Sequence, residues 1–192
     1  MKHSRKLWLG TMVALGAIAA ITLATAASAG QLFHQRFHDE GTFVNANFCG
    51  VPDLTVEGAF VVDGMERAVP HGPNGLAYFI EQVKFTVVLT NAANDKAVTE
   101  VGNVTSKDLK VTDNGDGTLT ILVLGTGNDV VYGPDGKAIA RDPGQTRFEI
   151  LVDDGGTPTD PSDDKFIADL GVVKGSTGRT DDFCAAVVPA LS

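Results

Sequence analysis

Apolar and polar residues alternate with a period of two in several stretches after residue 41, which is the pattern of strands with one buried face. In the longest run, apolar residues share one side of the chain and polar residues fill the other. The apolar positions of this run are Phe79, Val83, Phe85, Val87 and Leu89. Residues 54–62, 109–112 and 147–152 alternate in the same way. No stretch beyond the amino-terminal region repeats apolar residues with helical spacing over a dozen positions, so the pattern predicts an all-β chain.

Turn signals separate these runs at intervals typical of strands. The strongest is Asn114-Gly115-Asp116-Gly117, because Asn-Gly and Asp-Gly pairs supply the positive φ angles of tight hairpins. About eight strands with short connections indicate an antiparallel meander, which we expect to close into a single β-barrel because closure removes exposed edges. A two-sheet β-sandwich is the alternative. Residues 181–191 fit both a short helix and a closing strand.

The first 29 residues have the pattern of an export signal. Three basic residues precede an apolar stretch at 7–26, and Ala27-Ser28-Ala29 supplies the small residues that signal peptidase requires. Cleavage is favoured over retention as an anchor, and a secreted protein beginning at Gly30 is expected. We predict that residues 30–41 form an amino-terminal tail and that 42–192 form one β domain, with no membrane span after cleavage.

The charge balance of the chain is acidic. The 192 residues include 15 Lys and Arg and 24 Asp and Glu, and the predicted signal holds three of the basic residues and none of the acidic ones. The exported part therefore carries 12 − 24 = −12. Such a charge disfavours nucleic acid and anionic lipid and favours cations or basic protein surfaces as partners. Trp8 lies in the signal, which leaves few aromatic anchors for carbohydrate or protein interfaces.

Two cysteines remain after the signal, Cys49 and Cys184. In an exported chain an even cysteine count predicts a disulfide, and closing so long a loop stabilises the fold by about 4–5 kcal/mol. Their spacing lacks the local ligand pairs of a zinc site. We therefore expect a structural Cys49–Cys184 bridge and no cofactor.

An acidic loop is the most distinctive feature of the exported part. Its carboxylates are Asp153, Asp154, Asp160, Asp163 and Asp164. Carboxylate oxygens in this number are the ligands that calcium prefers, although the spacing matches no EF-hand. The interspersed Pro and Gly residues favour a solvated hairpin loop over a calcium site.

Glu81 is the residue most suggestive of a binding or catalytic site, because it falls on the apolar side of its strand beside Phe79 and Phe85. A carboxylate turned toward a core is costly unless it is paired or near the rim. One hypothesis is a ligand-orienting or acid–base group at a cavity mouth, flanked by these two rings. The favoured interpretation is a strand-end residue that reaches water, or a bulge that turns it outward.

From Phe48 to Cys184 the chain resembles a group of uncharacterised secreted proteins of actinobacteria. The residues that carry the resemblance are 114–121, 132–137, 155–164 and 171–179. The resemblance implies export and the Cys49–Cys184 bridge. It implies no activity and no catalytic residue.

Together these features predict a secreted, non-catalytic binding or surface-interaction module. A small apolar ligand inside the barrel is one form of this hypothesis, because closed eight-stranded barrels can hold one. The enzymatic alternative is a barrel-type cyclase, isomerase or hydrolase that uses Glu81 with a second acid or His71. A third hypothesis is calcium-dependent adhesion through residues 153–164.

Overall fold

The computed structural model describes residues 31–192, so the predicted export signal lies outside the described residues. The strands are β1 (Phe33–Asn45), β2 (Val56–His71), β3 (Leu76–Asn91), β4 (Ala97–Asp113), β5 (Thr118–Tyr132), β6 (Ala138–Arg141), β7 (Gly144–Asp153) and β8 (Lys165–Lys174). A short 3-10 turn, η1 (Phe48–Gly50), follows β1, and an α-helix, α2 (Phe183–Leu191), is the last element. None of the helices within the described range is long and apolar enough to cross a membrane.

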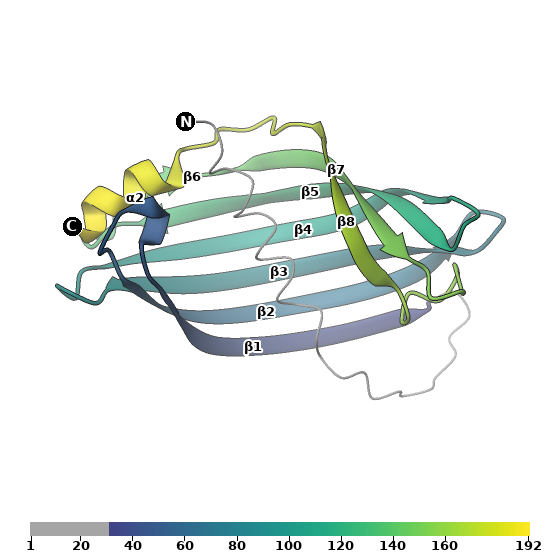
Figure 1. Ribbon diagram of the computed structural model, residues 1–192, viewed down its shortest axis with the longest axis horizontal. Coiled ribbons are helices and arrows are strands. Elements are labelled where there is room, and N and C mark those ends of the chain that lie inside the picture. Colours follow the sequence, from purple (N-terminus) through teal and green to yellow (C-terminus); the bar gives the residue numbers. More distant parts are fainter. Residues whose placement is uncertain (1–30) are drawn as a thin grey trace.

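The eight strands form one antiparallel sheet, which confirms the all-β prediction. Their order is β1-β2-β3-β4-β5-β7-β8, and the short β6 pairs with β5. In Figure 1 strands β1 to β5 lie side by side, while β7 and β8 turn diagonally away from them. The strand pairings of residues 31–192 do not join β8 to β1, so the sheet is not closed. The all-β class is therefore shown, and the choice between a β-barrel and a two-sheet β-sandwich stays a prediction.

The expectation of a tail at residues 30–41 is wrong for most of that segment, which forms the larger part of β1. This strand pairs with β2 along its whole length, from Phe33 opposite Ala68 to Asn45 opposite Val56. The alternation of apolar and polar residues is weak in β1, because β1 is an edge strand with exposed charged residues in its middle. Backbone pairing on one side is enough to hold such a strand, so its side chains need little apolar alternation.

The two faces of the sheet differ in what covers them. We call the face on which α2 packs the inner face, and the opposite one the outer face. The core around α2 contains Phe48, Leu54, Val56, Val87, Leu89, Val98, Val131, Ala140, Val187 and Leu191. A second core at the other end of the sheet contains Val111, Leu119, Ile121, Val123 and Val152. The middle of the inner face lies between these two apolar clusters.

Phenylalanine rings cover glycines of neighbouring strands on the inner face. The pairs are Phe37 over Gly64, Phe43 over Gly58, Phe60 over Gly41 and Phe85 over Gly102. A Cβ atom at Gly64 would lie 2.0 Å from the ring of Phe37, and one at Gly102 would lie 2.3 Å from that of Phe85. These glycines are therefore required by close approach, and the rings supply the apolar cover that a glycine lacks.

Helix α2 is held on the sheet by covalent and polar contacts. Cys49 of η1 and Cys184 of α2 form the expected disulfide, with Cα atoms 5.6 Å apart. Asp182 caps the helix by accepting a hydrogen bond from the backbone N–H of Ala185 at 3.0 Å. At the other end, the side-chain amide of the buried Asn91 donates to the carbonyl of Leu191 at 2.9 Å.

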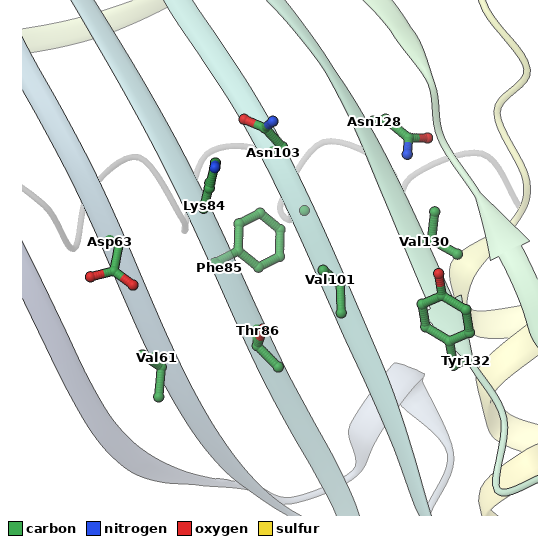
Figure 2. Close-up of a pocket in the computed structure, with 11 residues that line it drawn as sticks. Val61, Asp63, Lys84, Phe85, Thr86, Val101, Asn103, Asn128, Val130 and Tyr132 are labelled. Carbon is green, nitrogen blue, oxygen red and sulfur yellow. The ribbon is translucent and has the colours of Figure 1, made fainter. Parts of the chain in front are cut away.

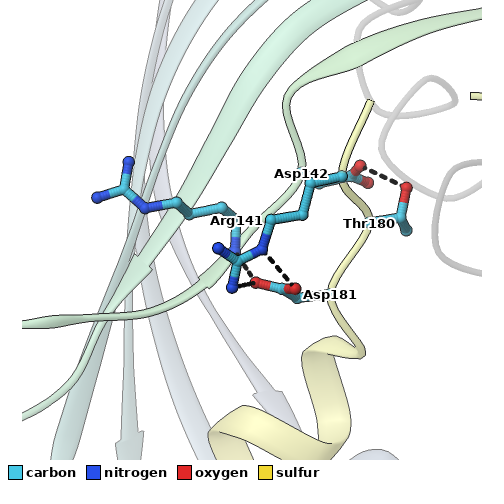
Figure 3. A network of polar contacts seen from close by, with 5 residues as sticks. Arg141, Asp142, Thr180 and Asp181 are labelled. Carbon is cyan, nitrogen blue, oxygen red and sulfur yellow. Dashed lines mark hydrogen bonds and ion pairs between the residues drawn. The ribbon is translucent and has the colours of Figure 1, made fainter. Parts of the chain in front are cut away.

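The segment before α2 is attached to β6 and the residue that follows it, as Figure 3 shows. Asp181 accepts a hydrogen bond from the backbone N–H of Arg141 at 3.0 Å and pairs with Arg179 at 2.7 Å. The hydroxyl of Thr180 donates to Asp142 at 3.0 Å. These contacts place residues 179–182 so that α2 begins beside the sheet. The open choice for residues 181–191 is thereby settled as a short helix.

Candidate functional site

Glu81 faces the inner side of the sheet, in the middle of its strand. It lies directly opposite Glu66 of β2 and Ser106 of β4, and the register of β3 is regular on both sides. The side chain therefore shares its face with Val83 and Phe85, as the alternation of the sequence indicates. Neither a bulge nor a strand end turns Glu81 outward, so the interpretation favoured from the sequence is wrong.

Glu66 and Glu81 form a carboxyl pair. Like charges directly opposite each other on neighbouring strands destabilise a sheet when both are ionised. Burial, the charge of Glu66 and a hydrogen bond to Glu66 together raise the pKa of Glu81 to about 7. Burial also raises the pKa of Glu66, and the hydrogen bond with Glu81 opposes that shift. Near neutral pH Glu81 is thus about half protonated, and the proton it holds is donated to Glu66.

A second carboxyl pair lies further along the inner face toward α2. Glu100 and Asp129 are diagonal neighbours on β4 and β5, since Glu100 opposes Val131 and Gly102 opposes Asp129. Glu100 is only 2% exposed. Burial, the charge of Asp129 and a hydrogen bond to Asp129 raise the pKa of Glu100 to about 8. The pKa of Asp129 is raised to about 6 by burial and by the charge of Asp142, against the hydrogen bond with Glu100.

A third pair joins the sheet to the acidic loop. Asp108 of β4 accepts a hydrogen bond from the backbone N–H of Phe79 at 2.8 Å. Burial and the charge of Asp164 raise the pKa of Asp108 to about 6, against the hydrogen bond from Phe79. The pKa of Asp164 is also raised to about 6, by burial and then by the charges of the other loop carboxylates, Asp163 first among them. The loop therefore lies close to the inner carboxyl groups.

These carboxyl groups have no cationic partner within residues 31–192. The ion pairs of that range involve His38, Lys137 and Arg179, all of which bind other acids. Oxygen atoms of Glu100, Asp129 and Asp164 are buried without a hydrogen-bond partner. We call Glu66, Glu81, Glu100, Asp108 and Asp129 the inner carboxyl groups. Sharing of protons is the means by which the described structure keeps them buried.

The two rings predicted to flank Glu81 lie on its face. Phe79 stacks on Phe33, with ring centroids 6.1 Å apart and planes 11° from parallel. Phe85 covers Gly102, whose Cβ position lies 2.6 Å from a carboxyl oxygen of Asp129. Phe85 thus separates the Glu66–Glu81 pair from the Glu100–Asp129 pair. His71 is elsewhere, packed against Tyr78 with ring centroids 4.6 Å apart.

Four of the five carboxylates considered for calcium act as acceptors in the turns of the loop. Asp153 accepts from the N–H of Gly155, Asp154 from Gly156 and Asp160 from Ser162, at 2.8–3.0 Å. Asp163 accepts from the hydroxyl of Thr157 at 2.5 Å. Within the described part of the chain, no three acidic, His or Cys side chains converge as metal ligands. The geometry supports the hairpin-loop interpretation of this segment, and calcium binding stays a prediction.

A depression with a volume of about 380 Å³, here called the outer depression, lies over the outer face instead. Figure 2 shows two lines of side chains that cross the strands there. The polar line contains Asp63, Lys84, Asn103 and Asn128, and the other contains Val61, Thr86, Val101 and Val130. Glu81 does not line this depression.

The chain was compared with known proteins at three levels. No protein-family model, no curated protein sequence and no solved structure matches it. The inner carboxyl groups and the outer depression are therefore interpreted from their own geometry.

Proposed function

We propose that the protein is a secreted, non-catalytic binding module whose inner face binds a cationic ligand with an apolar body. The observation that carries this proposal is the set of inner carboxyl groups without a described cationic partner. Phenylalanine rings lie between the two glutamate-containing pairs, so charge and apolar surface alternate along the face. The Cys49–Cys184 bridge is consistent with an extracellular protein.

A bound cation would replace the shared proton of a carboxyl pair. Two carboxylates that face each other repel when both are ionised, and an ammonium group between them removes that repulsion. The half-buried position of Glu66 and Glu81 strengthens such an interaction relative to one in bulk water. The neighbouring rings of Phe79 and Phe85 would contact the apolar body of the ligand and stabilise the cation through their faces.

The affinity for a cation is expected to depend on pH with a defined sign. Because the pKa of Glu81 is about 7, the pair carries close to one negative charge at pH 5.5 and approaches two at pH 8.5. Affinity should therefore rise with pH across this range. A glutamine at position 81 removes the titrating group, so the affinity of the Glu81→Gln variant should be lower and nearly independent of pH.

Isothermal titration calorimetry with three probes tests the proposal. Dodecylammonium below its micelle concentration supplies both charge and apolar body, dodecanol supplies the apolar body alone, and spermidine supplies charge alone. We expect dodecylammonium to bind tightest, and the Glu66→Gln/Glu81→Gln variant to lose about tenfold in affinity or more. Glu57→Gln, which changes an exposed carboxylate on the outer side of β2, is the matched control. Equal binding of dodecanol and dodecylammonium, or an unchanged affinity in the double variant, would contradict the proposal.

General acid–base catalysis at Glu81 is a second candidate, favoured by the pKa of about 7. A carboxyl group with a pKa near the working pH, hydrogen-bonded to a second carboxylate, suits proton transfer to and from a bound substrate. Nitrobenzisoxazole, whose ring opening reports proton abstraction from carbon, is a suitable probe. Catalysis by Glu81 predicts a rate that rises through pH 7 and is lost in Glu81→Gln but kept in Glu57→Gln. An equal rate in both variants would exclude it.

A further inference from the structure

The outer face carries a row of basic side chains that crosses the whole sheet. Strand register places His34, Arg67, Ile80, Lys107, Leu124, Arg147 and Lys174 directly opposite one another from β1 to β8. Residues opposite each other in antiparallel strands project from the same face. We call these seven residues the basic row. Arg67, Lys107, Arg147 and Lys174 are exposed.

The basic row is unpaired although acidic residues outnumber basic ones two to one after residue 29. None of the ion pairs within residues 31–192 includes a member of the row. Arg36 and Lys110 lie one step away on either side and are likewise exposed and outside those ion pairs. Glu149, which opposes Leu122 beside Lys110, is an acid that faces this region. The acids of the central strands instead point mainly to the inner face, so the sheet separates the two signs of charge.

A row of neutral polar side chains runs parallel to the basic row. Register places Gln82, Thr105, Thr126 and Gln145 opposite one another on β3, β4, β5 and β7. We call these four residues the neutral row. The polar line of the outer depression, Asp63 to Asn128, follows on its far side (Figure 2). Cations, amide and hydroxyl groups and a shallow depression therefore follow each other across the outer face.

The spacing of the cations suits an extended polymer that lies across the strands. Neighbouring strands are about 4.8 Å apart, so the seven strands of the row span roughly 29 Å. Arg67 and Lys107 lie two strands apart, as do Lys107 and Arg147, which gives cations at intervals of about 10 Å. At physiological ionic strength the Debye length is about 8 Å, so a bound chain interacts with this row more than with the acidic inner face.

We propose that the outer face binds an acidic polysaccharide, with its anionic groups on the basic row and its hydroxyl groups on the neutral row. Sulfate or carboxylate groups would pair with the Arg and Lys side chains, and the amides and hydroxyls of the neutral row suit sugar hydroxyls. Neither row contains a Phe, Tyr or Trp ring on which nucleic acid bases would stack. The apolar members of the rows, Ile80 and Leu124, are partly buried rather than exposed for insertion into a lipid surface. This proposal is independent of the one for the inner face.

Binding to dextran sulfate and to polygalacturonate, with neutral dextran as the blank, tests the proposal. The Arg67→Gln/Lys107→Gln variant should bind either acidic polymer about 10- to 30-fold more weakly than the unaltered protein. The slope of log affinity against log salt should fall in magnitude by about 1.4, or 0.7 for each lost contact. Lys96→Gln/Lys137→Gln removes the same charge from the turns at the α2 end and should leave both quantities unchanged. Circular dichroism and the melting temperature verify that each variant is folded.

Two results would overturn the proposal. One is an equal loss of affinity in both double variants, which would indicate a response to net charge alone. The other is the absence of binding to both acidic polysaccharides, including the case in which a single-stranded oligonucleotide or vesicles of anionic phospholipid bind through the same residues. Retention of acidic polysaccharide binding by Glu66→Gln/Glu81→Gln is expected, because that variant alters only the inner face.

Discussion

Replacing Glu100 with glutamine should stabilise the protein at alkaline pH and change little at acid pH. Glu100 is 2% exposed and its carboxyl group lies against Asp129. Its pKa is raised from 4.5 to about 8, so the folded protein holds this proton over a pH range in which the unfolded chain has lost it. Where the native state binds more protons than the unfolded one, stability falls as pH rises.

The size of the effect follows from the width of that range. Each pH unit between the two pKa values lowers the free energy of unfolding by up to about 1.4 kcal/mol. The loss through Glu100 between pH 5 and pH 8 is therefore about 4 kcal/mol. Glutamine has the shape of the protonated side chain and its amide can donate to Asp129. The variant therefore keeps the hydrogen bond to Asp129. It has no titrating group at position 100, so its free energy of unfolding does not fall with rising pH through this residue.

Urea denaturation at several pH values between 5 and 8.5, with the disulfide intact, measures this difference. Urea is preferred because guanidinium chloride would screen the charges under test. Glu100→Gln should match the unaltered protein within about 1 kcal/mol at pH 5 and exceed it clearly at pH 8. Glu57→Gln, on the outer side of β2, should follow the unaltered protein throughout. A variant that is equally destabilised at every pH would show that Glu100 is not held in its protonated form.

Three further contacts of the fold can be tested by substitution, with stability measured by urea denaturation. Replacing Cys49 and Cys184 together with serine should lower the free energy of unfolding by about 4–5 kcal/mol, because the bridge closes a span of 135 residues. Gly102→Ala should cost about 1–3 kcal/mol, since its Cβ would lie 2.3 Å from a ring carbon. The matched Gly125→Ala, whose nearest neighbour is 3.7 Å away, should change stability by less than about 0.5 kcal/mol. Asp182→Ala should cost about 1 kcal/mol by removing the cap of α2, while Asp182→Asn should retain most of it.

Much of the sheet was predictable because strand alternation is a local property. The period of two placed Phe79 through Leu89 on one face, and the turn at Asn114–Gly117 placed β4 beside β5, as the structure has them. The disulfide was predictable because the chain contains only two cysteines. Closure of the sheet could not be predicted in this way, because closure depends on whether β1 and β8 pair with each other. That depends on curvature accumulated over every strand between them.

The two ends of the domain were less predictable, for different reasons. β1 is an edge strand whose charged residues interrupt the alternation of apolar and polar residues. The sequence pattern therefore indicates this strand and its pairing with β2 only weakly. α2 is a nine-residue helix with Pro189 inside it, too short for its periodicity to decide between helix and strand. Its position is set by tertiary contacts, among them the bridge to Cys49 and the bond from Asn91 to Leu191.

The candidate site was half predictable. Glu81 was identified by its place on an apolar face, and Glu100 has the same signal between Val98 and Gly102 of β4. Their partners could not be identified, because the opposition of Glu66 to Glu81 depends on the register of β2 and β3. A register shift of one residue would turn Glu66 to the outer face and leave Glu81 without its proton acceptor.

The net charge of residues 30–192 is a poor guide to the partners of the protein for the same reason. A value of −12 argues against polyanions only if the charges are mixed over the surface. Here neighbouring residues of one strand, Glu66 and Arg67, project to opposite faces, and the register repeats that separation across the sheet. The outer face therefore carries more cations than acids around the basic row, while carboxyl groups lie on the inner face. The proposed binding of a cation on one side and of an acidic polymer on the other is therefore compatible with a single sheet, and the paired variants of the two faces test the two proposals separately.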